Sequence, residues 1–171
     1  QDVYFVDHAN LLISLSQISE TLCILLIPFF LKRYGIKRVM LIAMVAWAFR
    51  FGFFAIGNPS FPAVTWFILS MIVYGVAFDF FNISGSLFVN NETDSSIRSS
   101  AQGLFMIMTN GIGASIGMLI AQAVVNNFTY SQEAGGQFYT VGEWPIVWGI
   151  FAAYALLVAI FFALIFKEKN Q

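Results

Sequence analysis

The stretch PIVWGIFAAYALLVAIFFALIF, residues 145–166, contains no charged side chain in 22 consecutive positions. As an α-helix, a run of this length extends about 33 Å, which is enough to cross the hydrocarbon core of a bilayer. A chain that crosses lipid must be helical there, because the hydrocarbon offers no hydrogen-bond partner to exposed backbone groups. The stretch therefore predicts a transmembrane helix.

Four further apolar stretches of similar length precede it. The chain of 171 residues is 59% hydrophobic and 10% charged, which leaves too little polar surface for a water-soluble globule. We therefore expect an all-α transmembrane protein with five membrane-spanning helices in one helical bundle over residues 1–171. The expected spans are 9–31, 39–56, 63–89, 99–125 and 145–166. The chain begins at Gln1 and not at a methionine, so we expect it to be part of a longer protein.

Composition argues against several functional classes. Nine acidic and eight basic residues nearly balance, so no strongly basic face indicates a nucleic-acid partner. The single cysteine, Cys23, rules out a disulfide framework or a multi-cysteine metal site within the chain. The sequence has no phosphate-binding glycine motif and no nucleophile with a matching histidine. We expect no enzyme, no cofactor and no metal site.

The basic residues predict how the chain lies in the membrane, because Lys and Arg in short loops are retained on the cytoplasmic side. Three connections carry seven of the eight basic residues, which are Lys32, Arg33, Lys37, Arg38, Arg98, Lys167 and Lys169. The loops 57–62 and 126–144 carry none. We expect the N-terminus of the chain outside and its C-terminus in the cytoplasm.

The expected span 99–125 is rich in glycine, with Gly103, Gly111, Gly113 and Gly117. Glycines let a neighbouring helix approach closely, and they also let a helix bend. Packing and bending in a moving protein both remain open as their role.

Two carboxylates, Glu20 and Asp79, lie inside expected spans. A charge near the bilayer centre costs about 2.5–3.5 kcal/mol on insertion scales, so such residues normally face a bundle interior or an aqueous cavity. Each is therefore a candidate functional residue. The structural alternative is an ion pair with Arg50, the single basic residue inside an expected span.

Polar and aromatic side chains accompany both carboxylates at helical spacing. Ser16 and Gln17 precede Glu20 by four and three positions, which predicts a polar stripe on one helix face. The third span repeats this pattern with Gly75, Asp79, Asn82 and Ser86, beside the aromatic pair Tyr74 and Phe78. Such groups at membrane depth suit a polar, ring-bearing solute. Glu20 or Asp79 could also couple solute movement to protons, because a buried carboxylate exchanges a proton as its surroundings change.

Four stretches carry a resemblance to a known family. The segment PFFLKRYGIKR (28–38) resembles a cytoplasmic loop of the major facilitator superfamily, although Pro28 and Lys32 replace its usual glycine and aspartate. The other three stretches are SLSQISET (14–21), SMIVYGVAFDFFNISG (70–85) and RSSAQGLFMIMTNG (98–111). Together they resemble the bacterial nucleoside:proton symporter family of that superfamily, over essentially the whole chain.

The resemblance implies a fold and a set of site residues. The five expected helices would correspond to helices eight to twelve of a twelve-helix transporter, with the earlier helices absent before Gln1. By the same resemblance, Gln17 and Glu20 face the nucleoside, Tyr74 and Phe78 line the same cavity, and Asp79 is essential for transport.

The resemblance also implies proton-coupled nucleoside uptake across the bacterial inner membrane by alternating access. The implied partners are a nucleoside, protons, the lipid bilayer and the N-terminal helices of the same transporter, without nucleic acid. Two alternatives remain, which are a facilitator for a sugar or oligosaccharide and a membrane protein that binds a nucleoside without moving it. Whether the complete protein carries nucleosides or sugars, we expect no uptake by this chain alone.

Overall fold

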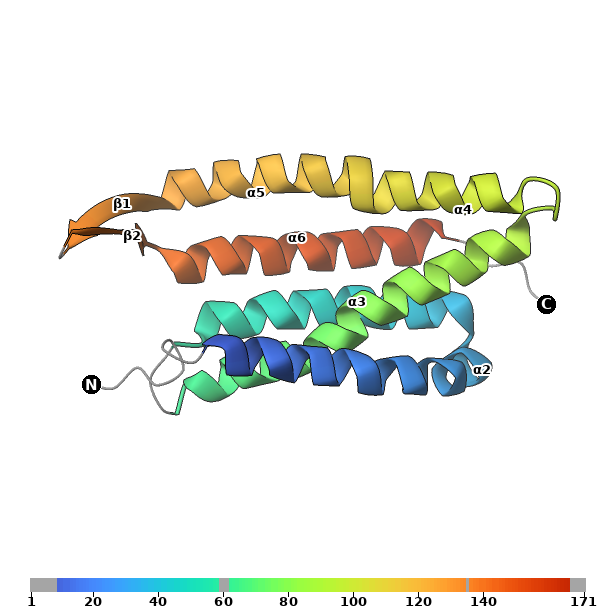
Figure 1. Ribbon diagram of the computed structural model, residues 1–171, viewed down its shortest axis with the longest axis horizontal. Coiled ribbons are helices and arrows are strands. Elements are labelled where there is room, and N and C mark those ends of the chain that lie inside the picture. The colour runs from blue at the N-terminus through green and yellow to red at the C-terminus, as the bar shows by residue number, and fades with distance from the viewer. Residues whose placement is uncertain (1–8, 59–61, 135, 167–171) are drawn as a thin grey trace. The chain divides into compact units, whose positions relative to one another are not determined.

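The computed structural model describes residues 9–58, 62–134 and 136–166. The chain divides into two compact units, Gln1–Gly85 with Trp148–Gln171 (unit 1) and Ser86–Val147 (unit 2). The elements in chain order are α2 (Ala9–Ile56), α3 (Val64–Glu92), α4 (Arg98–Met106), the π-helix η1 (Ile107–Gly113), α5 (Ala114–Phe128), β1 (Thr129–Ala134), β2 (Gln137–Gly142) and α6 (Trp144–Ile165) (Figure 1).

Helix α2 is two helices joined at one residue. Its only non-helical backbone is at Gly35, where φ is 77° and ψ is 169°. Only glycine adopts such a positive φ at little energetic cost. The first arm (residues 9–34) and the second arm (residues 36–56) run side by side in opposite directions (Figure 1). The loop predicted at residues 32–38 is therefore much shorter in the structure. Lys and Arg are good helix formers, and the helix continues through them on both sides of Gly35.

The core of unit 1 lies where both arms of α2 meet α3. Its buried members are Cys23, Ile27, Val39, Ala43 and Phe80. Phe30 of the first arm packs edge-on against Phe80, with ring centroids 5.1 Å apart. Apolar packing thus holds the three helical segments together.

Helix α6, from Trp148 onward, packs against the second arm of α2 in unit 1. The Trp148 ring lies 4.9 Å from that of Phe54 between centroids. Near the other end of α6, Lys37 Nζ donates a hydrogen bond of 3.1 Å to the carbonyl of Ala163. A cation is favourable there, because the last carbonyls of a helix lack partners within the helix.

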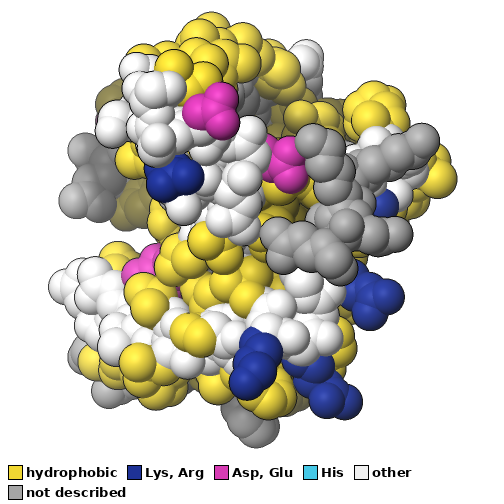
Figure 2. All heavy atoms as spheres, turned by 90° about the vertical axis from the view of Figure 1, so that its right-hand side faces the viewer, with side chains coloured by type: hydrophobic (Ala, Val, Ile, Leu, Met, Phe, Trp, Pro, Cys, Tyr) yellow, Lys and Arg dark blue, Asp and Glu magenta, His cyan; other side chains and the backbone are white. Residues whose placement is uncertain are grey.

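Basic side chains gather at the end of unit 1 where α2 reverses. Lys32, Arg33, Lys37 and Arg38 flank Gly35 in the sequence. Figure 2 looks onto this end and shows Lys and Arg side chains on its surface. The hydrogen bond from Lys37 places the C-terminal turn of α6 at the same end.

Unit 2 contains a helix that is not α-helical throughout. The predicted span 99–125 is found as α4, η1 and α5 in direct succession, so its middle seven residues are π-helical. Gln102 of α4 and Ser86 are joined by two hydrogen bonds, from Ser86 Oγ to Gln102 Oε1 (2.9 Å) and from Gln102 Nε2 to the Ser86 carbonyl (2.6 Å). These bonds fix the start of this helix against the end of α3.

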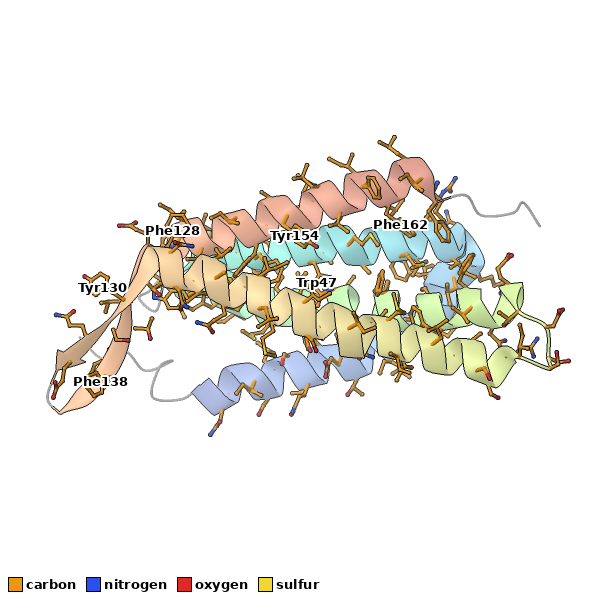
Figure 3. All side chains as sticks on the ribbon, turned by 90° about the horizontal axis from the view of Figure 1, so that it is seen from above. Trp47, Phe128, Tyr130, Phe138, Tyr154 and Phe162 are labelled. Atoms are coloured by element: carbon orange, nitrogen blue, oxygen red, sulfur yellow. The ribbon has the colours of Figure 1, made fainter. Side chains whose placement is uncertain are left out.

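A β-hairpin corrects the prediction of an all-α protein. Strands β1 and β2 pair antiparallel from Thr129 opposite Gly142 to Ala134 opposite Gln137. Tyr130 and Phe138 lie on these strands, Phe138 near the tip (Figure 3). Aromatic and β-branched residues favour strands, and the two glycines at 135–136 suit a two-residue hairpin connection. The segment 126–144 was predicted as a loop because it lacks an apolar run.

By length and composition, four helices in the described part of the chain could cross a membrane. One of them, α2, is the pair of antiparallel arms described above. The chain is thus a helical membrane protein, as its sequence predicts.

Candidate functional site

The two membrane carboxylates are brought together by a close crossing of α2 and α3. Ser19 and Glu20 of the first arm lie against Gly75, where an added Cβ would come within 2.8 Å of their backbone atoms. Ser19 Oγ also donates a hydrogen bond to the carbonyl of Ile72. Asp79 follows Gly75 by one helical turn on α3, so both carboxylates lie near this crossing.

Asp79 is the more deeply placed of the two. Its side chain is 9% exposed, and its Oδ2 atom is buried without a hydrogen-bond partner in the described structure. A buried polar atom without a partner costs about 1–3 kcal/mol, and more when it is charged. Glu20 is half-buried. Asp79 is thus a group that folding alone would not favour at this position.

Tyr74 and Phe78 form an aromatic pair one turn apart on α3. Their rings are stacked, with centroids 5.6 Å apart and planes 21° apart. Tyr74 is half-buried, whereas Phe78 is 38% exposed. The pair therefore offers a partly open aromatic surface beside Asp79.

Arg50 of the second arm also belongs to this cluster, although the sequence did not identify it as a site residue. Its guanidinium carbon lies 4.1 Å from the centroid of the Tyr74 ring. The Nη1 atom is buried and has no hydrogen-bond partner among the described residues. Asp79 Oδ2 likewise lacks a hydrogen-bond partner, so these two atoms are not bonded to each other. The signal that could have identified Arg50 is its charge inside a span together with Trp47 and Phe54 at helical spacing.

The members of the polar stripe predicted on the first arm differ in burial. Ser16 is buried, like Ser19, and its hydroxyl donates to the carbonyl of Ile13 at 2.8 Å. Gln17 is exposed one turn before Glu20. An amide exposed on a membrane helix is expected to face polar surroundings and not lipid. Gln17 and Glu20 are thus the less buried members of the stripe, whereas the Ser16 hydroxyl is used within its own helix.

Of the further members of the predicted stripe on α3, Asn82 and Ser86 are occupied locally. Asn82 Nδ2 donates to the carbonyl of Phe78 at 2.9 Å. Ser86 is bonded to Gln102 as described above. Their side chains therefore have structural roles here.

Two hollows on the surface of unit 1 are lined mainly by apolar side chains and contain none of the predicted site residues. One lies between the second arm of α2 and α3, at Val73 and Val76. The other is lined by Phe81 together with Trp47 and Tyr154, and Figure 3 labels the last two residues. Such linings suit apolar neighbours better than a polar solute. The candidate site is the polar and aromatic cluster at the α2–α3 crossing. Within the described residues, no group of His, Cys, Asp and Glu could hold a metal ion.

A family model described as Nucleoside H+ symporter matches residues 1–171 of the chain. The chain belongs to this family. The resemblance inferred from the four sequence stretches is thereby confirmed. The family is one of transporters, in agreement with the prediction that the chain is not an enzyme.

Named relatives of this symporter-family chain are bacterial permeases. It is 52% identical over 170 residues to the xanthosine permease of Escherichia coli (strain K12), covering 99% of the chain and 39% of the permease. It is 50% identical over 167 residues to the nucleoside permease NupG of the same organism, covering 98% of the chain and 38% of NupG. With its apolar helices, this makes the chain part of a multi-pass inner-membrane protein.

The fold of this symporter-family chain is similar to that of solved transporter structures. A crystal structure of the nucleoside transporter NupG matches with a TM-score of 0.84 and 50% identity, over 97% of this chain and 39% of that one. A mutant form of NupG matches with a TM-score of 0.87 and 49% identity, over the same shares. The chain thus spans about two fifths of the length of the relatives it matches.

Proposed function

We propose that this chain is the C-terminal part of a twelve-helix transporter that takes up nucleosides with protons across the bacterial inner membrane. We refer to that whole protein as the complete transporter. Transport would proceed by alternating access, in which two helical bundles rock about a site near the middle of the membrane. Membership of the Nucleoside H+ symporter family supports both the nucleoside and the proton as substrates.

One observation carries this proposal beyond family membership. Asp79 is buried without a hydrogen-bond partner for Oδ2, and it follows the stacked Tyr74–Phe78 pair on α3. A ring-binding surface and a carboxylate at membrane depth are the two features that a proton-coupled nucleoside carrier needs.

The residues divide the work by their chemistry. Gln17 and Glu20, on the edge of the first arm, would form hydrogen bonds with the sugar or base. Tyr74 and Phe78 would pack against the ring of the base. Asp79, the most buried titratable carboxylate of the cluster, would exchange the coupling proton.

Five membrane crossings are part of the proposal, with each arm of α2 crossing once. The first crossing would start outside and α6 would end in the cytoplasm. Two observations support this orientation. Basic residues flank Gly35 at one end of unit 1, and Lys37 is bonded to the last turns of α6 at that same end.

The test is uptake of radiolabelled uridine by cells or vesicles that contain the complete transporter. We expect concentrative uptake that collapses to equilibration when a protonophore is added. Excess unlabelled nucleoside should compete, and excess glucose or lactose should not. Uptake that is insensitive to the protonophore would refute the coupling to protons, and competition by sugars alone would refute the substrate class.

A further inference from the structure

Arg50 is enclosed by aromatic rings. Its guanidinium carbon lies 5.6 Å from the Trp47 ring centroid and 5.7 Å from that of Phe54, both on its own arm of α2. The third ring is Tyr74 of α3, at 4.1 Å. Trp47 and Tyr74 also touch edge-to-face, with centroids 6.0 Å apart. The cation is thus held by three rings, and its closest ring is the one that belongs to the candidate site.

A structural role explains this arrangement poorly. A cation inside a membrane span is costly, and Arg50 Nη1 is buried without a hydrogen-bond partner in the described structure. A methionine or leucine would fill the same aromatic enclosure without that cost. The ring that the guanidinium approaches most closely is that of Tyr74, a candidate site residue. The charge of Arg50 therefore serves the site and not the packing of α2.

The Tyr74 ring needs such a partner. The torsion that sets the plane of an aromatic ring is broad, so the side-chain rotamer alone does not define the face that a nucleobase would meet. A guanidinium attracts the face of a ring, which fixes the ring plane. Arginine does this better than lysine, because its planar group can lie along the ring.

We propose that Arg50 is a positioning residue that holds the Tyr74 ring in the orientation in which it stacks with Phe78 and receives the nucleobase. The inference rests on the proposed nucleoside uptake and adds a residue that the sequence motifs did not identify. Arg50 acts through Tyr74 and does not itself touch the solute.

The first test compares Arg50→Met and Arg50→Lys in the complete transporter. We expect Arg50→Met to raise KM for uridine about tenfold, within the range that loss of one base–aromatic stack produces, with a much smaller change in the maximal rate. Arg50→Lys should raise KM by about twofold to threefold, because an ammonium keeps the charge but not the planar contact. The matched control is Arg33→Met, because Arg33 lies over the Tyr34 ring at 5.8 Å but is exposed and outside the site. That variant should leave KM unchanged.

The second test asks whether the effect passes through Tyr74. In a Tyr74→Leu background, Arg50→Met and Arg50→Lys should cause no further rise in KM, because the ring that Arg50 positions is absent. Rises in KM that multiply across the two positions would overturn the proposal, since Arg50 would then act independently of Tyr74.

Protein stability separates positioning from a purely structural role. A normal KM in well-folded Arg50→Met, or a lower melting temperature with KM unchanged, would also overturn the proposal. If Arg50→Met fails to fold, the KM of Arg50→Lys is compared instead, once with Tyr74 present and once in the Tyr74→Leu background. Absence of uridine uptake by the unmodified transporter would speak against the proposed function itself, and it would be seen before any Arg50 variant is measured.

Discussion

An aspartate and an asparagine have nearly the same shape, but only the aspartate can carry and release a proton. We expect Asp79→Asn in the complete transporter to abolish gradient-driven accumulation, so that the ratio of internal to external uridine does not exceed about one. The reason is that the amide preserves the local geometry but cannot exchange a proton. Accumulation of labelled uridine in vesicles with an imposed proton gradient measures this.

The control for that prediction is Asp94→Asn, which makes the same chemical change at an exposed position after α3. It should leave accumulation unchanged. Full gradient-driven accumulation by Asp79→Asn would exclude Asp79 as the proton-coupling residue and would direct attention to Glu20, its neighbour in the cluster.

Sequence reasoning could reach part of this site. The cost of a charge in a membrane identified Glu20 and Asp79, and helical spacing placed Tyr74 with Phe78. Spacing could not decide which side of the first arm is buried. That depended on α3, whose Gly75 approaches Ser19 so closely that the small serines take the buried side. The position of Arg50 over Tyr74 depends likewise on the packing of two helices.

At the scale of the helices, the crossing at Gly75 determines how close Glu20 and Asp79 lie. A Cβ on residue 75 would be 2.8 Å from backbone atoms of Ser19 and Glu20, which cannot yield as a flexible side chain could. We expect Gly75→Ala to lower the free energy of unfolding by about 1–3 kcal/mol, as overpacked substitutions do, and to reduce uridine uptake. Thermal unfolding of the complete transporter in detergent measures the first effect.

Gly52 provides the matched control for Gly75. It also lies in a helix, but nothing is within 4 Å of the position that its Cβ would take. Alanine there should keep or slightly raise stability, because alanine is the better helix former. Equal destabilisation by Gly52→Ala and Gly75→Ala would mean that helix backbone effects, and not the crossing, explain the loss.

A hydropathy profile bears on the length of an apolar segment but not on its local backbone geometry. Spans such as 63–89 and 145–166 differ from α3 and α6 by three residues or fewer at each end. The reversal at Gly35 and the π-helical turns of η1 are backbone events, and a hydropathy profile carries no information on φ and ψ. The hairpin escaped prediction because its strands are short and partly polar.

Sequence motifs were more informative at the scale of the whole molecule. They predicted the family, which the match over residues 1–171 confirms. Orientation in the membrane remains a prediction, because it depends on the distribution of Lys and Arg relative to a bilayer and not on contacts within the protein. The Lys37–Ala163 hydrogen bond supports it by joining the basic segment to the end of α6.

The chain alone should insert into a membrane but not transport. Alternating access needs two bundles that rock about a central site, and this chain spans about two fifths of the length of its relatives. We therefore expect vesicles that contain only this chain to take up labelled uridine no faster than empty vesicles. Co-expression with a separate polypeptide that holds the preceding helices of the complete transporter should restore saturable uptake, because the two parts can reassemble through their helix interfaces. Saturable, protonophore-sensitive uptake by this chain alone would show that the second bundle is dispensable, or that two copies of the chain replace it.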